Sequence, residues 1–206
     1  MSAQLTQALI LEGAHVRLEP LTLGHLDGLC AVGLDSDLWR WDSIQKRSRQ
    51  DMETYVQKAL DEQKRGVSLP FATVFLVTGQ VIGSTRYLNI DLANRRVEIG
   101  ATWIAKPWQR TAVNSEAKYL MLRHAFEVLE CFRVELKTDA LNERSRRAIL
   151  RLGAKEEGTL RRHMVTDTGR VRDTVYFSIL DHEWPAVKAR LQAKLNPRYM
   201  PAGTRA

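Results

Sequence analysis

The feature that most constrains the fold is a run of three strand-like segments in the middle of the chain. Apolar and β-branched residues fill 71–78 and 81–90, and apolar residues alternate with small or polar ones over 96–105. The connections are a Gly79-Gln80 dipeptide and a polar turn over 91–95, which are too short for the crossover that parallel neighbours need. The three segments therefore predict an antiparallel meander.

The period of the pattern changes after this meander. Apolar residues recur at helical spacing over 114–129, a strand pattern follows at 133–139, and a second helix at 142–152 ends at Gly153. The remaining predicted elements are a strand at 15–20, helices at 23–34 and 48–65, strands at 157–166 and 172–181, and an amphipathic helix at 183–195. We expect an α/β (α+β) fold, in which helices flank a mixed, mostly antiparallel twisted sheet of about seven strands with a strand–helix–strand unit at its centre.

The pattern contains no repeat or linker, so residues 1–206 predict a single domain, with a core at about 14–182, the helix at 183–195 and a flexible tail at 196–206. With 44% hydrophobic and 27% charged residues, the composition excludes a disordered or coiled-coil chain. No segment is apolar enough to span a membrane, the N-terminus lacks the features of a secretory signal, and the two cysteines have no metal-ligand spacing. We therefore expect a cytoplasmic protein.

The net charge of +7 is unevenly distributed. Residues 1–103 carry 11 basic and 12 acidic side chains, whereas residues 104–206 carry 20 and 12, so the entire excess lies in the second half. Such an excess suits an anionic partner, either a nucleic acid or a polyanionic cofactor. The chain contains no helix-turn-helix, zinc-finger or RNP motif, and its histidines show no metal-ligand spacing, so we expect neither direct nucleic-acid binding nor a metal site.

The junction between the strand at 96–105 and the following helix is the first candidate site. A tight loop there directs successive backbone N–H groups outward at the positive end of a helix dipole, which suits a pyrophosphate. The side chains of Arg110 and Lys118 could add positive charge. The loop consists of Gln109, Arg110, Thr111, Ala112, Val113 and Asn114.

A second motif lies after the strand at 133–139. It begins with Asn142-Glu143-Arg144-Ser145 and ends, one helix later, with Leu152-Gly153-Ala154. With this motif the chain resembles the GNAT superfamily of acetyl-CoA-dependent N-acetyltransferases, and within it the RimJ/RimL-like branch, which acetylates the N-termini of ribosomal proteins. The resemblance extends over nearly the whole chain, from the strand at 15–20 to Glu183-Trp184-Pro185.

The resemblance implies that acetyl-CoA is the cofactor, and it assigns residues to each part of that molecule. Asn142 and Ser145 face the pantetheine and the thioester in this family. Backbone amides near Trp103 and Ile104 contact the oxyanion, because the strand that carries them separates from its neighbour. The pyrophosphate binds at the loop over 109–114.

The loop departs from the family pattern Q/R-x-x-G-x-G/A, because Ala112 and Asn114 occupy its two glycine positions. Ala112 is small enough for a phosphate to approach the backbone, and Asn114 tolerates left-handed geometry and is a good helix N-cap. Backbone binding of the pyrophosphate remains the prediction, with a homologue that binds the cofactor weakly or not at all as the alternative. Of the arginines at 144, 146 and 147, Arg147 is preferred for the 3′-phosphate.

Acetyl transfer to an amine requires a base for the amine proton and a hydrogen-bond donor for the departing thiolate. We expect Ser145 to be the thiolate partner, and Glu98, which by alternation points to the same side as Thr102, to be the base through a water molecule. His163 is a competing base, and Tyr176 on the last strand is a further candidate acid. The alternatives are that Ser145 caps or packs within its helix, that Glu98 is structural, and that Tyr176 packs in the core.

The acceptor side is assigned to Trp39 and Trp41 in the polar loop over 35–49, and to Arg86 and Tyr87. The alternative for the tryptophans is that they hold this loop on the core. We expect direct transfer to a protein N-terminal α-amine in a ternary complex. A small amine (an aminoacyl-nucleotide, antibiotic or polyamine) is the alternative acceptor, and a non-catalytic CoA-binding or ribosome-binding homologue is the alternative function. A homodimer, common in this family, also remains open.

Overall fold

The structure, a computed structural model, describes residues 9–195. Its centre is an eight-stranded sheet with the order β1-β2-β3-β4-β5-β6-β8-β7. The strands are β1 (Leu11–Glu12), β2 (Val16–Pro20), β3 (Ser68–Phe75), β4 (Gln80–Asp91), β5 (Arg96–Ile104), β6 (Arg133–Asp139), β7 (Lys155–Val165) and β8 (Val171–Leu180). Neighbouring strands are antiparallel except β5 and β6, which are parallel. The predicted meander and the mixed sheet are confirmed, and the short strand β1, which was not predicted, enlarges the sheet.

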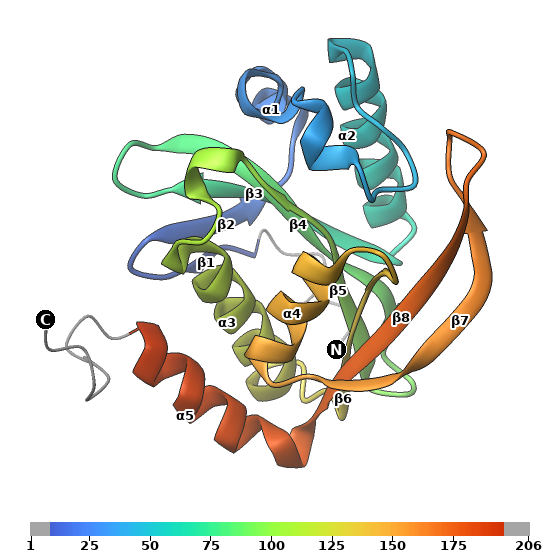
Figure 1. Cartoon of the computed structure of the whole chain (residues 1–206). Coiled ribbons are helices and arrows are strands. Elements are labelled where there is room, and N and C mark those ends of the chain that lie inside the picture. The colour runs from blue at the N-terminus through green and yellow to red at the C-terminus, as the bar shows by residue number, and fades with distance from the viewer. Residues whose placement is uncertain (1–8, 196–206) are drawn as a thin grey trace, which may run out of the picture.

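Helices cover both faces of this sheet (Figure 1). They are α1 (Leu26–Gly33), α2 (Arg49–Lys64), α3 (Ala112–Glu127), α4 (Glu143–Leu152) and α5 (Trp184–Leu195). Helices α1 and α2 pack on β4 and β3, whereas α3 packs on β2 and β5, α4 on β6, and α5 on α3. No helix within residues 9–195 has the length and apolarity to cross a membrane. The predicted tail at 196–206 lies outside the described residues.

Strand β4 shows why the two helical layers lie on opposite faces. Ser84 and Arg86 point to α2, where both contact Tyr55. Thr85 and Tyr87 point to α3, where both contact Met121. This alternation follows from the period of two along a strand. The face of α3 and the face of α2 are therefore two separate environments on either side of one strand.

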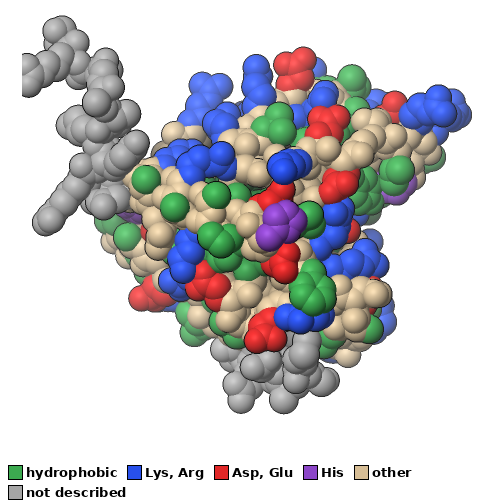
Figure 2. Space-filling view, turned by 90° about the horizontal axis from the view of Figure 1, so that it is seen from below, with side chains coloured by type: hydrophobic (Ala, Val, Ile, Leu, Met, Phe, Trp, Pro, Cys, Tyr) green, Lys and Arg blue, Asp and Glu red, His purple; other side chains and the backbone are tan. Residues whose placement is uncertain are grey.

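Basic and acidic side chains are interspersed on the face of the molecule seen in Figure 2. Several ion pairs join basic and acidic residues of the second half of the chain. These pairs are Arg133–Glu157 at 2.8 Å, Lys155–Glu183 at 2.6 Å and Lys188–Glu127 at 2.7 Å. Because each pair uses an acidic residue of the same half, the pairs leave the excess of positive charge in that half unchanged.

Helix α3 begins two residues earlier than the predicted start at 114. The side chain of Thr111 caps it and accepts a hydrogen bond from the N–H of Val113 at 3.3 Å. Asn114, predicted as a good N-cap, lies in the first turn of the helix instead. The predicted helix at 142–152 is confirmed as α4, which starts directly after Asn142.

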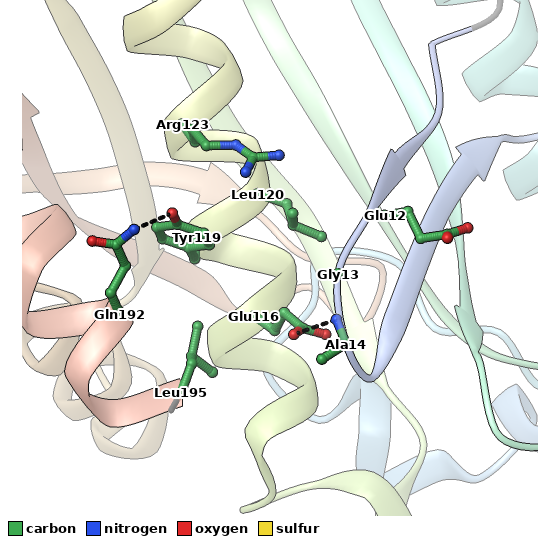
Figure 3. Close-up of a pocket in the computed structure, with 9 residues that line it drawn as sticks. All are labelled: Glu12, Gly13, Ala14, Glu116, Tyr119, Leu120, Arg123, Gln192 and Leu195. Atoms are coloured by element: carbon green, nitrogen blue, oxygen red, sulfur yellow. Dashed lines mark hydrogen bonds between the residues drawn. The ribbon is translucent and has the colours of Figure 1, made fainter. Parts of the chain in front are cut away.

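Glu116 anchors the first two strands to α3 (Figure 3). Its buried carboxylate accepts hydrogen bonds from the N–H groups of Ala14, His15 and Val16 at 2.7–2.8 Å. Gly13 leaves room for it, since a Cβ there would lie 2.5 Å from Cδ of Glu116. A pocket of about 310 Å³ lies beside this contact, between the β1–β2 turn, α3 and α5, and none of its lining residues belongs to β5, β6 or α4.

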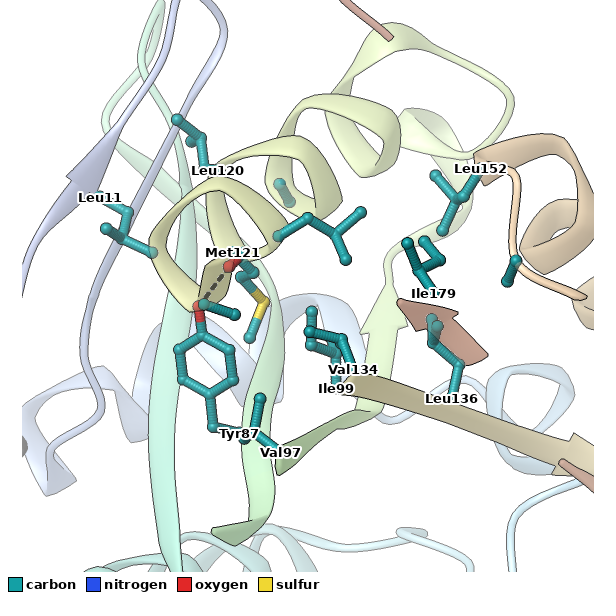
Figure 4. Close-up of a cluster of buried hydrophobic side chains, with 14 of the residues drawn as sticks. Leu11, Tyr87, Val97, Ile99, Leu120, Met121, Val134, Leu136, Leu152 and Ile179 are labelled. Carbon is teal, nitrogen blue, oxygen red and sulfur yellow. Dashed lines mark hydrogen bonds between the residues drawn. The ribbon is translucent and has the colours of Figure 1, made fainter. Parts of the chain in front are cut away.

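The main hydrophobic core lies between the sheet and α3 (Figure 4). Tyr87 is fully buried there, and its hydroxyl donates a hydrogen bond of 2.6 Å to the carbonyl of Met121. A smaller core under α1 and α2 contains Trp39, Met52 and Trp103. Burial of each large apolar side chain contributes roughly 1.5–3 kcal/mol. The two cores therefore hold the sheet between its helical layers.

We expect the substitution Glu116→Gln to lower the free energy of unfolding by about 1–3 kcal/mol, because the amide NH2 group replaces one accepting oxygen and leaves at least one of the three backbone N–H groups unpaired. Urea unfolding followed by circular dichroism measures the change. Glu12→Gln is the matched control, since Glu12 lines the same pocket but makes only a 3.8 Å pair with Arg17, largely in solvent. The control should change stability by about 0.5 kcal/mol at most, and an equal loss in both variants would contradict the anchoring role.

Candidate functional site

The site begins where β5 and β6 separate. The two strands pair in parallel over three residues, ending at Glu98 and Glu135, and pair nowhere else within residues 9–195. Strand β5 nevertheless continues to Ile104, still paired with β4, and β6 continues to Asp139. A gap therefore opens in the middle of the sheet, and one of its edges is the backbone of β5.

The backbone of β5 presents a hydrogen-bond donor to this gap. The N–H of Ala105 points to β4, where it donates to the carbonyl of Ile82 at 2.9 Å. Successive N–H groups of a strand point to opposite edges, so the N–H of Ile104 faces the gap and that of Trp103 faces β4. Of the two predicted backbone donors, Ile104 is the one whose N–H the geometry directs to the gap.

A β-bulge in β5 borders the same gap. The register between β4 and β5 shifts at Thr85, which faces both Ala101 and Thr102. Ala101 has a φ of +46°, a conformation that costs a non-glycine residue about 1–3 kcal/mol. The extra residue turns Thr102 to the α3 face, where it contacts Thr85 at 2.7 Å. The prediction that Glu98 and Thr102 share one side is wrong, because the bulge reverses the alternation between them.

The loop before α3 forms a candidate anion site without glycine. Gln109 donates from Nε2 to the last carbonyl of β5 at 2.6 Å, and the exposed Arg110 has a left-handed φ of +65°. Ala112, Val113 and Asn114 are helical residues of α3. The two positions that hold glycine in the family pattern therefore need none of glycine's conformational freedom here. The unpaired N–H groups at the start of α3 are available to an anion.

The two predicted cofactor motifs meet in the structure. Nη2 of Arg144 at the start of α4 donates to Oε1 of Gln109 in the loop before α3. The two helix N-termini are thereby brought together at the end of the gap. Arg147, the arginine preferred from the sequence, is 69% exposed and pairs with Glu143 at 3.8 Å. Arg144 is thus the arginine that reaches the loop, and no sequence pattern distinguishes it from Arg146 and Arg147.

Asn142 and Ser145 form the cap of α4. Oδ1 of Asn142 accepts a hydrogen bond from the backbone N–H of Ser145 at 3.0 Å. The cap uses the backbone of Ser145 and leaves its hydroxyl free for other partners, and the residue is partly exposed. Both residues therefore have a structural role in the helix, which does not prevent the Ser145 hydroxyl from contacting a ligand.

Glu98 lies on the opposite face of the sheet from α3. Its side chain is 1% exposed, and Oε2 accepts hydrogen bonds from Asn89 at 2.8 Å and from Nζ of Lys137 at 3.0 Å. Oε1 is buried with no partner within residues 9–195, and a Cβ on Gly100 would lie 2.8 Å from it. A buried carboxylate with one free oxygen can accept a proton or a hydrogen bond.

Lys137 connects the two other catalytic candidates to Glu98. Its Nζ lies 5.6 Å from the ring centroid of Tyr176, and that ring meets the ring of His163 at 6.0 Å. Burial lowers the pKa of Lys137, but the charge and hydrogen bond of Glu98 outweigh this effect and raise the pKa above its usual value. Lys137 is not among the predicted site residues, although the alternation over 133–139 places it on the face opposite to the core.

The predicted acceptor residues do not form one surface. Trp39 is 1% exposed, and its ring packs at a tilt against that of Trp103 with the centroids 5.2 Å apart. Its Nε1 donates to a backbone carbonyl, so Trp39 holds its loop on the core, as in the alternative prediction. Tyr87 faces α3, whereas its neighbour Arg86 faces α2, so these two residues cannot line one acceptor surface. Trp41 is half-buried, with the guanidinium of Arg170 5.6 Å from its ring centroid.

A contact between the loop after α1 and the tip of the β7–β8 hairpin was also missed. The N–H of Asp167 donates to the carbonyl of Ser43 at 2.8 Å, and Oδ2 of Asp167 accepts from the N–H of Gln45 at 2.9 Å. Nη1 of Arg172 donates to the hydroxyl of Ser43 at 3.3 Å. These bonds join the α2 side of the molecule to the hairpin. No local pattern in the sequence signals them.

Lys118 does not contribute to the loop as predicted. It is 6% exposed and points from α3 to the sheet, where Nζ donates to Oγ1 of Thr102 and, at 3.4 Å, to Oγ1 of Thr85. Burial lowers the pKa of Lys118 to about 7, against the opposing effect of Glu98. Helical spacing from the buried Met121 could have indicated that this lysine faces the core.

Solved structures share this architecture. A GCN5-related N-acetyltransferase from Brucella melitensis is 36% identical and superposes with a TM-score of 0.86, over 97% of this chain and 91% of that one. RimJ from Mycobacterium smegmatis, solved in complex with CoA-disulfide, shares the fold with a TM-score of 0.76 at 23% identity, over 91% of this chain and 93% of that one.

Sequence comparison agrees with the fold. YdaF of Bacillus subtilis, provisionally named a ribosomal N-acetyltransferase, is 36% identical over 113 residues, which are 55% of this chain and 61% of YdaF. The match therefore spans less than two thirds of that relative. The family model of the acetyltransferase (GNAT) domain matches residues 15–155. The chain belongs to the GNAT family of acetyltransferases, which use acetyl-CoA as the acetyl donor.

Proposed function

We propose that this chain transfers the acetyl group of acetyl-CoA directly to a primary amine, and that the acceptor is the N-terminal α-amine of a protein. The gap between β5 and β6 is the observation that carries the proposal. The N-termini of α3 and α4, which suit phosphates, lie at the end of this gap. The Glu98 carboxylate lies on the face of the sheet opposite to α3. The name of YdaF supports a ribosomal protein as the acceptor.

The residues around the gap fit acetyl-CoA, which supplies an activated acetyl thioester when bound. The start of α3 offers backbone N–H groups and the positive end of a helix dipole to a pyrophosphate, with the guanidinium of Arg110 nearby. The N–H of Ile104 is an edge donor for a carbonyl oxygen. Arg144 at the loop and the exposed Arg147 are the candidate partners of the 3′-phosphate.

The amine is activated from the other face. Asn89 and Lys137 hold Oε2 of Glu98, so that Oε1 is the oxygen left to take a proton. Because Glu98 is 1% exposed, a water molecule relays the proton from the amine. Ser145, at the N-terminus of α4, donates a hydrogen bond to the departing thiolate, whose negative charge the helix dipole also favours.

One contact limits the width of an acceptor that can reach the site. Ser43 and Gln45 of the loop after α1 are hydrogen-bonded to Asp167 of the β7–β8 hairpin. We take these two segments to border the acceptor side, and the bonds between them leave room for a narrow acceptor. An N-terminal amine is itself the narrow end of an extended chain. Both acceptors are therefore compatible with this contact, and the choice between them is experimental.

We expect calorimetric titration to detect saturable acetyl-CoA binding, and thiol release to follow with peptides that carry a free N-terminus. The same peptides with a blocked N-terminus, and with an internal lysine, are the controls. Release with polyamines or aminoacyl-nucleotides alone would favour the small-amine alternative. Absence of acetyl-CoA binding would refute the enzymatic function.

We expect Ser145→Ala to reduce kcat by about 100-fold, because the thiolate loses its hydrogen-bond donor. The Kd of acetyl-CoA should change by less than about twofold, since the backbone cap of α4 does not need the hydroxyl. Thr54→Ala, at an exposed threonine of α2 to which no part of the site is assigned, is the control. An unchanged kcat would remove Ser145 from the reaction.

For Glu98→Gln we expect kcat/KM for the amine to fall by about 100-fold at saturating acetyl-CoA, because an amide cannot accept the proton. Glu135→Gln is the matched control, since Glu135 is the register partner of Glu98 on the same face and is also ion-paired, to Arg133 at 2.8 Å. Steady-state kinetics of both variants separate a role in proton transfer from a general effect of negative charge. Equal losses would exclude Glu98 as the base.

A further inference from the structure

Lys118 is a buried charged residue that the proposed mechanism does not use. The side chain of Lys118 lies between α3 and the sheet, and its hydrogen bonds go to two hydroxyls, those of Thr102 and Thr85. No carboxylate oxygen within residues 9–195 lies within 4.0 Å of its Nζ. Burial of an amine without an ion pair is costly, and an apolar side chain of similar size is often at least as stable. Stability alone therefore gives no reason for a lysine here.

The partners of Lys118 lie at the bulge of β5. Thr102 is one of the two residues that face Thr85, and its hydroxyl also donates to the carbonyl of Gly100 at 3.3 Å. The Thr85 and Thr102 hydroxyls are 2.7 Å apart. One amine thus ties α3, β4 and β5 together beside the strained Ala101. This part of β5 is the part that no longer pairs with β6 and borders the gap.

The surroundings of Lys118 make its protonation sensitive to a charge brought close to it. The groups that face it are the neutral Thr85 of β4 and Thr102 of β5, and within residues 9–195 the charge that raises its pKa is that of Glu98, on the other face of the sheet. With a pKa lowered to about 7 by burial, and raised in part by Glu98, the amine is only partly protonated at neutral pH. Negative charge brought close to it favours the ammonium form.

We propose that Lys118 is a positioning residue for acetyl-CoA, which holds the bulged segment of β5 through Thr102 and takes up a proton when the anionic cofactor occupies the adjacent gap. This inference rests on the proposed position of the cofactor in the gap between β5 and β6. The ammonium form donates more strongly to the hydroxyl of Thr102 than the neutral amine does. The side chain of Lys118 thereby couples the charge of the cofactor to the backbone geometry of the bulged segment of β5.

Calorimetry of acetyl-CoA binding at pH 7.5, in HEPES and in Tris, tests the coupling because the two buffers differ in ionisation enthalpy. A rise of one unit in the pKa of Lys118 on binding corresponds to an uptake of about half a proton at this pH. Lys118→Met should lower the uptake by that amount and raise the Kd by about threefold. Lys64→Met, at an exposed lysine of α2, is the matched control and should equal the wild type.

Two threonine variants keep the test decisive if Lys118→Met does not fold. Thr102→Val removes the hydroxyl that Lys118 binds and should raise the Kd, whereas Thr102→Ser retains it and should not. Equal Kd values for these two variants, or equal proton uptake by wild type and Lys118→Met, would overturn the inference while leaving the proposed function intact. Absence of acetyl-CoA binding by the wild type would overturn the proposed function as well.

Discussion

The separation of β5 and β6 after three paired residues determines where every other part of the site lies. Parallel neighbours require a crossover, and α3 provides it, so the N-terminus of α3 follows directly from the free end of β5. Strand β6 runs in the same direction and is followed by α4, which brings a second helix N-terminus to the same end of the sheet. The anion site is consequently a product of topology. This explains why Ala112 and Asn114 can stand where the family has glycine.

The bulge at Ala101 divides the chemistry between the two faces of the sheet. In a regular strand Glu98 and Thr102 would share a face, and the hydroxyl of Thr102 would lie on the side of the sheet away from Lys118. The extra residue instead directs Thr102 to α3 and leaves Glu98 with Lys137 on the other face. The left-handed conformation of Ala101 costs about 1–3 kcal/mol, and the pairing with β4 on both sides of the bulge holds it in place.

The sequence predicted the sheet because burial leaves a period of two in every strand that has one covered face. It could not predict the bulge, since Ala101 carries no residue signal for a left-handed conformation. Alternation could have excluded one of Arg86 and Tyr87 from the acceptor side, because neighbours on a strand face opposite ways. The contacts of Arg144 with Gln109 and of Ser43 with Asp167 join segments that are far apart in the chain, so no local pattern encodes them.

The uneven charge of the chain can now be located. Ion pairs within the second half remove equal numbers of both signs and cannot produce its excess. The excess must come from other cations, and three of these lie at the gap: Arg110 exposed on the loop, Arg144 against Gln109, and Lys118 buried under the bulge. Field lines from exposed cations steer an anion from solution, whereas a buried amine acts once the anion has arrived. We therefore propose that the basic half of the chain uses different residues to attract a polyanion and to hold it once bound.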